Sequence, residues 1–457
     1  MDKLAEKHNG IIEGVIWKQL LIFFFPILLG TFFQQLYNTV DAVIVGKFVG
    51  KQALAAVGGA TGTLINLFVG FFVGLSSGAT VIIAQYYGAK NETMTGKTVH
   101  TAAAMGIAGG LFLTAVGLIF APAMLRAMNT TDDVIDLAIT YLRIYFTGMV
   151  FNLLYNIGSS ILRAVGDSKR PLYFLAVTTV ANLLLDLLFV LAFDMGVAGV
   201  GIATVISQAI SAVLVLACLS RTKECYRLEL RKIRFDFPLL RHIVKIGLPA
   251  GIQSSMFSIS NVIIQSTINS FGTDTMAAWT AYGKIDSVYW MIMSAFGISI
   301  TTFAGQNFGC GKYDRLRKSV RISLGMAFSA TVLLSTVLML FGKYIFLLFA
   351  DDPAVLDIGM EMLTTLVPFY FTYVLVEILS GAIRSTGESL RPMIITGVGI
   401  CLLRIVWIAV TVSTDGNLKM LLYGYPTTWA TTSLLIALYY IRGKWLKRRI
   451  AETSLQL

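Results

Sequence analysis

The sequence predicts an all-α polytopic membrane protein, with twelve transmembrane helices in two pseudo-symmetric six-helix lobes. Hydrophobic residues make up 56% of the 457 residues and charged residues only 13%, whereas a soluble domain carries about 25% charged residues. Apolar runs of about twenty residues or more recur along the chain, long enough to cross a bilayer. Backbone inside lipid must satisfy its own hydrogen bonds, so we expect these runs to be helices.

The apolar runs define the expected helices in chain order. They cover residues 19–46, 52–85, 98–122, 134–162, 171–193, 197–219, 239–270, 275–306, 319–347, 356–383, 392–413 and 420–441. The first run is too long for the core of a signal peptide and lacks a small-residue cleavage site, so we expect it to be a retained helix.

Lysine and arginine separate by the side of the membrane. Alternate segments, starting with the N-terminus, hold 28 of the 36 Lys and Arg residues, and the positive-inside rule makes this side cytoplasmic. We therefore expect a multi-pass protein of the cell membrane with both termini in the cytoplasm. Its parts are a cytoplasmic N-terminal segment (1–18), an N-lobe (19–219), a cytoplasmic linker (220–238), a C-lobe (239–441) and a cytoplasmic tail (442–457). The net charge of +11 reflects this topology, and we expect no nucleic-acid partner.

The two halves of the chain repeat one another. The segment ILRAVGDSKRP (Ile161–Pro171) matches AIRSTGESLRP (Ala382–Pro392), and each follows the fourth helix of its half. Further matched pairs are Pro26/Pro249, Gly50/Gly272 and Gln85/Gln306. An even number of helices separates the members of each pair, so the halves share one orientation. Parallel repeats of this kind are a transporter architecture, with the substrate path between the halves.

Other function classes have no signature in the sequence. The four cysteines show neither CxxC spacing nor pairing, so we expect no disulfide, no metal centre and no cofactor. No HExxH, Ser/His/Asp set or Gly-rich phosphate loop occurs in the spans, so we do not expect an enzyme.

Two buried acids and a threonine share one depth in the first lobe. With a rise of about 1.5 Å per residue, Asp41 lies roughly 8 Å, Asp186 about 12 Å and Thr204 about 9 Å below the outer ends of their helices. Side chains four residues apart share a helix face, which adds Tyr37 to Asp41 and Asn182 to Asp186. Ionisable groups inside a membrane are costly, so this set predicts a functional site.

Three stretches of the chain resemble the multidrug and toxic compound extrusion (MATE) family. They are FPILLGTFFQQLYNTVDAVIVGKFVG, GLSSGATVIIAQYYGA and RAVGDSKRP, and the similarity covers about residues 15–445. The resemblance implies export of lipophilic, usually cationic compounds, driven by inward flow of H⁺ or Na⁺. The chain resembles the DinF-type branch more than the NorM-type branch, because no acid follows Gly247-Leu248-Pro249 in the seventh helix.

The resemblance also implies a cation pocket in the N-lobe. Similar transporters build it from an Asp in helix 1, an Asn and an Asp in helix 5 and a Thr in helix 6, with a Tyr four residues before the first Asp. The matching residues here are Asp41, Asn182, Asp186, Thr204 and Tyr37. Two carboxylates in a low-dielectric pocket repel each other, so the pair should hold a proton near neutral pH. The same oxygens could instead cage Na⁺, and the sequence leaves both uses open.

Four further charged residues lie near mid-depth in the second lobe. They are Lys284, Asp286, Glu377 and Arg404. They could form structural ion pairs, Asp286 with Arg404 or Glu377 with Lys284, or they could line a substrate cavity. Arg143 in the fourth helix has no obvious partner in the sequence.

We therefore expect a monomeric secondary transporter that exports lipophilic organic cations in exchange for H⁺ or Na⁺ by alternating access. Pro26 removes a backbone hydrogen bond in the first helix and marks either a bending point or a static kink. Gln34 lies near Asp41 on this helix and is a candidate cavity residue. The alternative is a flippase-type exporter of a lipid-linked or amphipathic metabolite. Such a protein needs a basic cavity, whereas the buried charges of the first lobe are mostly acidic.

Overall fold

The computed structural model describes residues 10–349, 352–414 and 416–454. The chain divides into two compact units. The N-unit is Phe25–Ser255, and the C-unit combines the chain up to Phe24 with the chain from Met256 onward. Both divisions fall inside helices, α2 (Ile16–Ile44) and α10 (Phe237–Asn269), whereas the sequence placed the lobe boundaries at helix ends.

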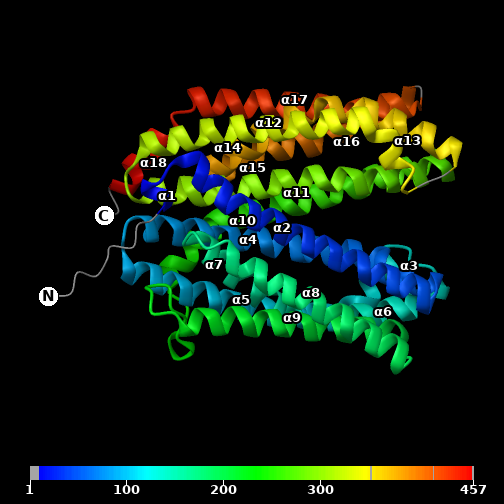
Figure 1. Cartoon of the computed structure of the whole chain (residues 1–457), viewed down its shortest axis with the longest axis horizontal. Coiled ribbons are helices and arrows are strands. Elements are labelled where there is room, and N and C mark those ends of the chain that lie inside the picture. The colour runs from blue at the N-terminus through cyan, green and yellow to red at the C-terminus, as the bar shows by residue number, and fades with distance from the viewer. Residues whose placement is uncertain (1–9, 350–351, 415, 455–457) are drawn as a thin grey trace. The chain divides into compact units, whose positions relative to one another are not determined.

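The N-unit is built from long helices that run side by side (Figure 1), with α4 against α5 and α8 against α9. Between its shares of α2 and α10 it contains η1 (Val45–Val49), α3 (Lys51–Gly58), α4 (Ala60–Gly88), α5 (Glu92–Ala127), α6 (Asp132–Thr147), α7 (Met149–Ala164), α8 (Lys169–Leu187), η2 (Leu188–Ala192), α9 (Gly196–Arg221) and η3 (Leu230–Lys232).

The C-unit begins with α1 (Gly10–Glu13) and the start of α2, and it resumes with the second part of α10. It contains α11 (Thr273–Gly309), α12 (Tyr313–Phe346), α13 (Pro353–Leu366), η4 (Val367–Tyr373), α14 (Val374–Ser385), α15 (Leu390–Thr396), η5 (Gly397–Leu402), α16 (Leu403–Thr414), α17 (Leu418–Arg442) and α18 (Trp445–Ser454). The short helices α1 and α18 lie at the same end of this unit (Figure 1).

Most of the helical rods are long and apolar enough to cross a membrane. Within the described residues, 9 helices meet this test, and the bent pair of α6 and α7 brings the number to 10. The remaining two of the twelve predicted spans are α10 and α17, with 33 and 25 residues. Both exceed the length that a bilayer requires, but neither contains a stretch apolar enough to meet the test.

Two predicted helices are interrupted. The chain bends by 49° between α6 and α7, at Gly148, where we expected one helix over 134–162. The helix expected over 356–383 passes through the 3₁₀ segment η4, which contains Pro368. A proline has no N–H to donate and its ring clashes with the preceding turn, which accounts for this break. By contrast, α2 is continuous through Pro26.

The internal repeat predicted from the sequence is present in the backbone. Gly166 (φ 96°) and Gly387 (φ 92°) adopt the left-handed conformation in the turns after α7 and α14. Gly50 (φ 118°) and Gly272 (φ 101°) do the same before α3 and α11. Because only glycine adopts positive φ without strain, the matched glycines allow the corresponding turns of the two halves to share one conformation.

Glycines bring α4 and the first half of α10 into close contact within the N-unit. A Cβ atom on Gly74 would lie 2.6 Å from the Cα atom of Gly251. A Cβ atom on Gly78 would collide with the carbonyl oxygen of Ile243. Small residues at four-residue spacing let the backbones of membrane helices approach, so this contact depends on the absence of side chains.

Candidate functional site

Four of the side chains predicted to form a cation pocket are buried in the N-unit. Asp41 lies on α2, Asn182 and Asp186 lie one turn apart on α8, and Thr204 lies on α9. Between 0% and 6% of their surfaces is exposed. Helix α8 packs along α9 and also reaches α2, where the hydroxyl of Thr179 donates to the carbonyl of Phe33 at 3.5 Å. We call these four residues the N-unit pocket.

Electrostatic interactions connect the members of the N-unit pocket. The carboxyl groups of Asp41 and Asp186 interact electrostatically with each other. The phenol of Tyr37 interacts with Asp41 and with the hydroxyl of Thr204. The structure therefore brings Tyr37 and the four residues of the N-unit pocket together.

The polar atoms of the N-unit pocket outnumber their protein partners. Within the described residues, Asp41 Oδ1, both carboxylate oxygens of Asp186 and both amide atoms of Asn182 are buried without a protein donor or acceptor. The hydroxyl of Thr204 donates to the carbonyl of Val200 at 2.9 Å, which leaves its lone pairs for another donor or a cation. Two carboxylates that face each other in a buried site require a proton or a cation between them.

Two π-helical segments adjoin the N-unit pocket. Segment η1 begins four residues after Asp41, and η2 begins two residues after Asp186. The two segments contact each other, and Val45 of η1 and Val190 of η2 are buried in one hydrophobic cluster with Tyr141. A π turn inserts an extra residue into the helical ladder and occurs often at functional sites. The hydrophobic pattern of the sequence did not indicate these segments.

Helix α6 contributes two residues that the sequence analysis missed. The phenols of Tyr141 and Tyr145 both interact electrostatically with Asp41, and Tyr141 also interacts with Asp186 and Thr204. Their four-residue spacing places them on one face of α6 and was the available signal. Arg143 lies on the exposed side of this helix and makes no ion pair within the part of the chain that the structure describes.

Asp286 is the centre of an aromatic cluster in the C-unit. Its carboxylate accepts hydrogen bonds from the hydroxyl of Tyr370 at 2.6 Å and from Nε1 of Trp290 at 2.7 Å. The hydroxyl of Tyr282 lies 3.5 Å from the same carboxylate and 2.8 Å from the hydroxyl of Tyr370. The rings of Tyr289 and Tyr370 stack with centroids 4.2 Å apart. These donors satisfy Asp286 without a basic partner in direct contact.

The ion pairs considered from sequence do not form among the described residues. Arg404 and Asp286 interact only beyond ion-pair distance. Instead, the guanidinium of Arg404 lies 4.1 Å from the ring centroid of Tyr425 and donates to the hydroxyl of Thr428 at 3.4 Å. A cation over an aromatic face is stabilised by the ring quadrupole, which explains how Arg404 is accommodated.

Glu377 and Lys284 also do not form the ion pair that the sequence suggested, within the part of the chain that the structure describes. Glu377 is half-buried, interacts with Arg384 and accepts from the hydroxyl of Tyr373 at 3.5 Å. Lys284 is exposed on α11. Because Lys284 and Asp286 are only two residues apart, they point to different sides of the helix. Lys284 and Asp286 therefore do not share the buried cluster.

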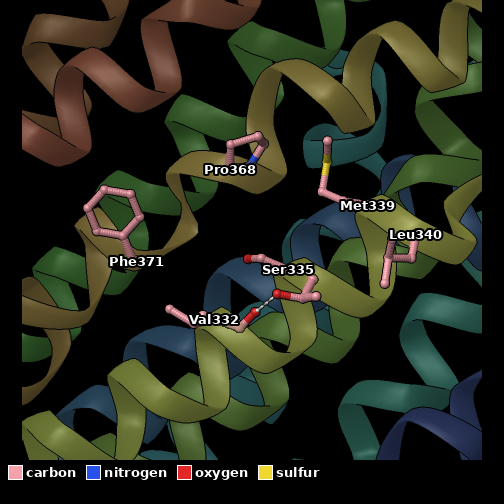
Figure 2. A pocket seen from close by; sticks show the side chains of 7 residues that line it. Val332, Ser335, Met339, Leu340, Pro368 and Phe371 are labelled. Carbon is pink, nitrogen blue, oxygen red and sulfur yellow. Dashed lines mark hydrogen bonds between the residues drawn. The ribbon is translucent and has the colours of Figure 1, made fainter.

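One groove lies in the C-unit between α12 and η4 and has a volume of about 290 Å³. Figure 2 shows the side chains that line it, mainly Val332, Met339, Leu340, Pro368 and Phe371. The hydroxyl of Ser335 donates to the carbonyl of Val367 at 3.0 Å, at the helix break. No charged side chain lines the groove, so its surface suits apolar chains. Over the described ranges, no group of three His, Cys, Asp or Glu side chains could hold a metal ion.

Comparisons with known proteins identify relatives over nearly the whole chain. The family model MatE matches residues 26–188 and 249–410. The chain is 30% identical over 446 residues to "Probable multidrug resistance protein YoeA" of Bacillus subtilis (strain 168), covering 96% of each chain. It is 29% identical over 448 residues to "Probable multidrug resistance protein YpnP" of the same organism, covering 96% of this chain and 98% of the relative. Its fold matches a solved structure described as the "Outward-facing conformation of a multidrug resistance MATE family transporter of the MOP superfamily". The TM-score of this match is 0.89 at 21% sequence identity, and the match covers 97% of this chain and 99% of that chain.

Proposed function

Because this chain belongs to the MatE family of membrane transporters, we propose that it is a multidrug exporter that moves lipophilic organic cations out of the cell in exchange for H⁺ or Na⁺. The names of the relatives support export of drugs. The observation that carries the coupling proposal is the facing pair of buried carboxyls, Asp41 and Asp186, with unpartnered oxygens. These relatives offer no support for the lipid-linked flippase alternative, and we do not retain it.

Coupling follows from the charge of the N-unit pocket. When both carboxyls are ionised, their repulsion destabilises the closed arrangement of α2 and α8 around them. A proton shared between the carboxyls, or Na⁺ held by them with Asn182 and Thr204, removes this repulsion. A cation therefore binds one packing of these helices better than another, and this difference in affinity is all that a switch requires.

Two features of α2 support its role as the moving element. The boundary between the units falls between Phe24 and Phe25, one residue before Pro26. The missing N–H of Pro26 weakens the helical ladder at this point, and η1 follows Asp41 at the other end of α2. We propose that α2 bends at Pro26 when the cation binds at Asp41.

Substrate contacts are proposed for exposed polar residues of the spanning helices. Gln34 on α2 and Lys284 on α11 are exposed, and a charged side chain within a span favours a water-filled cavity over lipid. We propose a monomer in the cell membrane with both termini in the cytoplasm, because the lysine and arginine residues concentrate on that side.

The test is ethidium efflux from proteoliposomes under separately imposed proton and sodium gradients. The proposal predicts efflux against the dye gradient with at least one of the two ions, and loss of this efflux in Asp41→Asn. Efflux that follows neither ion gradient in the wild-type protein would refute cation-coupled export. Normal efflux in Asp41→Asn would remove the N-unit pocket from the mechanism.

A further inference from the structure

The N-unit holds a cavity that the proposed transport mechanism does not use. It has a volume of about 650 Å³ and lies between the start of α5 and the segment that joins α9 to α10. Six lysine and arginine side chains and four acidic side chains contribute to its lining. We call it the linker cavity. None of the residues of the N-unit pocket lines it.

Most of the acidic side chains of the linker cavity already have local partners. Glu229 pairs with Lys232 at 2.9 Å, and this hydrogen bond lowers the pKa of Glu229 below its ordinary value. Asp236 accepts from the N–H of Leu239 at 3.3 Å at the start of α10. Glu92 lies in the first turn of α5, where the helix dipole favours a negative charge. Glu224 is the fourth acid of the lining.

The basic side chains of the linker cavity are mostly uncommitted. Arg227 donates to the carbonyl of Ser220 at 3.1 Å. Four others make no ion pair with any residue that the structure describes: Lys97, Lys223, Arg231 and Arg234. The free charge of the linker cavity is therefore positive, and an anion is the ligand that it favours.

Hydrogen bonds hold the segment that joins α9 to α10 (residues 222–236) against α5. The backbone N–H of Glu229 donates to Nε2 of His100 at 3.1 Å, and the N–H of Asp236 donates to the hydroxyl of Thr101 at 3.3 Å. Nδ1 of His100 lies 2.6 Å from the carbonyl of Gly96, which assigns the imidazole proton to Nδ1. Positive charge alone would determine membrane orientation without any such fixed cavity, so orientation does not account for this arrangement.

Large apolar side chains project from the same segment and from the start of α10. Leu230 is 66% exposed and Phe237 is 74% exposed, and the ring of Phe235 lies 6.4 Å from that of Phe237. The segment connects the ends of two membrane-spanning helices, so it lies close to the membrane surface. Basic and apolar side chains together are typical of surfaces that bind anionic lipids.

We propose that the linker cavity binds the phosphate headgroup of an anionic phospholipid, with Leu230 and Phe237 against its acyl region. Arg231 and Arg234 would hold the phosphate through charge-assisted hydrogen bonds. A free phosphate ion shares the headgroup chemistry but gains nothing from the apolar side chains. The choice of the anionic cytoplasmic leaflet rests on the orientation given under Proposed function, whereas binding in detergent does not depend on it.

The test measures quenching of a tryptophan placed at position 237. The full-length variant Phe237→Trp in detergent is titrated with brominated phosphatidylglycerol and with brominated phosphatidylcholine. The measured signal is the fluorescence quenching of the variant minus the quenching of the wild-type chain, because the wild-type chain has 6 tryptophans of its own. We expect phosphatidylglycerol to bind more tightly than phosphatidylcholine. Removal of each basic residue should weaken the binding of phosphatidylglycerol by about fivefold. Arg231→Gln with Arg234→Gln should therefore reduce the preference by about 25-fold.

Controls separate this proposal from its alternatives. Arg231→Lys with Arg234→Lys keeps the charge and should restore the preference, and Lys318→Gln, an exposed charge on α12, should leave it unchanged. Leu230→Ser should weaken lipid binding. An equal loss with Lys318→Gln, or no preference between the two lipids, would overturn the headgroup site. Displacement of the lipid by micromolar inorganic phosphate would assign the linker cavity to a soluble phosphate and overturn the lipid assignment.

Discussion

Replacing Asp286 with asparagine should destabilise the C-unit. The carboxylate accepts from Tyr370 through Oδ1 and from Trp290 through Oδ2. Asparagine keeps one acceptor oxygen and turns the other position into a donor, so one of the three donors around it, Tyr282, Tyr370 or Trp290, loses its acceptor even if the two phenols reverse their shared hydrogen bond. An unpaired buried donor costs about 1–3 kcal/mol, and the loss of a charged acceptor adds about 1 kcal/mol. We therefore expect a destabilisation of about 2–4 kcal/mol.

The assay is thermal unfolding of the purified protein in detergent, followed by tryptophan fluorescence. For a unit of about 200 residues, 1 kcal/mol lowers Tm by about 2–4 °C, so Asp286→Asn should lower Tm by about 4–16 °C. Lys284→Gln, exposed on the same helix, is the matched control and should shift Tm by less than about 1 °C. An unchanged Tm in Asp286→Asn, combined with loss of transport, would refute the stabilising role of Asp286 and assign it to the transport path.

Two further predictions concern the packing and the titration of the N-unit. Gly78→Ala should reduce the free energy of unfolding by about 1–3 kcal/mol, because the new methyl group would collide with the carbonyl of Ile243. This loss should appear as a measurably lower Tm. Gly325→Ala on α12, where a Cβ atom meets nothing within 4 Å, should leave Tm unchanged or raise it, and equal shifts would contradict the packing argument. Burial, with Glu92 and Glu224 nearby, raises the pKa of Cys225 to about 11, so its reactive thiolate is scarce at pH 8. The rate of alkylation, followed by peptide mass spectrometry, should be about 100-fold lower at Cys225 than at an ordinary thiol. This rate should rise about tenfold per pH unit up to pH 10. A rate that is high and independent of pH would contradict the prediction.

Much of the N-unit pocket was predictable because burial of charge in a membrane is costly. Asp41 and Asp186 stood out as acids within apolar runs, and the helical rise assigned them to one depth before any fold was known. Tyrosines carry no comparable cost, so Tyr141 and Tyr145 left only a weak four-residue spacing in a helix that also carries several other polar side chains. The π turns of η1 and η2 depend on packing between helices, which periodicity does not encode.

The C-unit shows where charge counting fails. Opposite charges at equal depth suggested that Asp286 pairs with Arg404, yet aromatic hydroxyl and indole groups satisfy Asp286 instead. Tyrosine and tryptophan can donate hydrogen bonds from an apolar environment, and a sequence with 18 tyrosines and 6 tryptophans does not indicate which of them do so. The repeat, in contrast, was predictable in detail, because its glycines are required by positive φ at Gly166 and Gly387.

The central claim is that Asp41 and Asp186 bind one cation as a unit, and a double-mutant comparison of coupled ethidium efflux tests it most directly. Asp41→Asn and Asp186→Asn should each abolish ion-driven efflux, because either change removes one of the two facing carboxylates. If each single change lowers the rate by about 100-fold, the double variant should also be lower by only about 100-fold, since residues that act as a unit are not additive. All three variants must retain the Tm of the folded protein. A double variant that loses about 10,000-fold, or an Asp186→Asn variant that transports normally, would contradict the shared site.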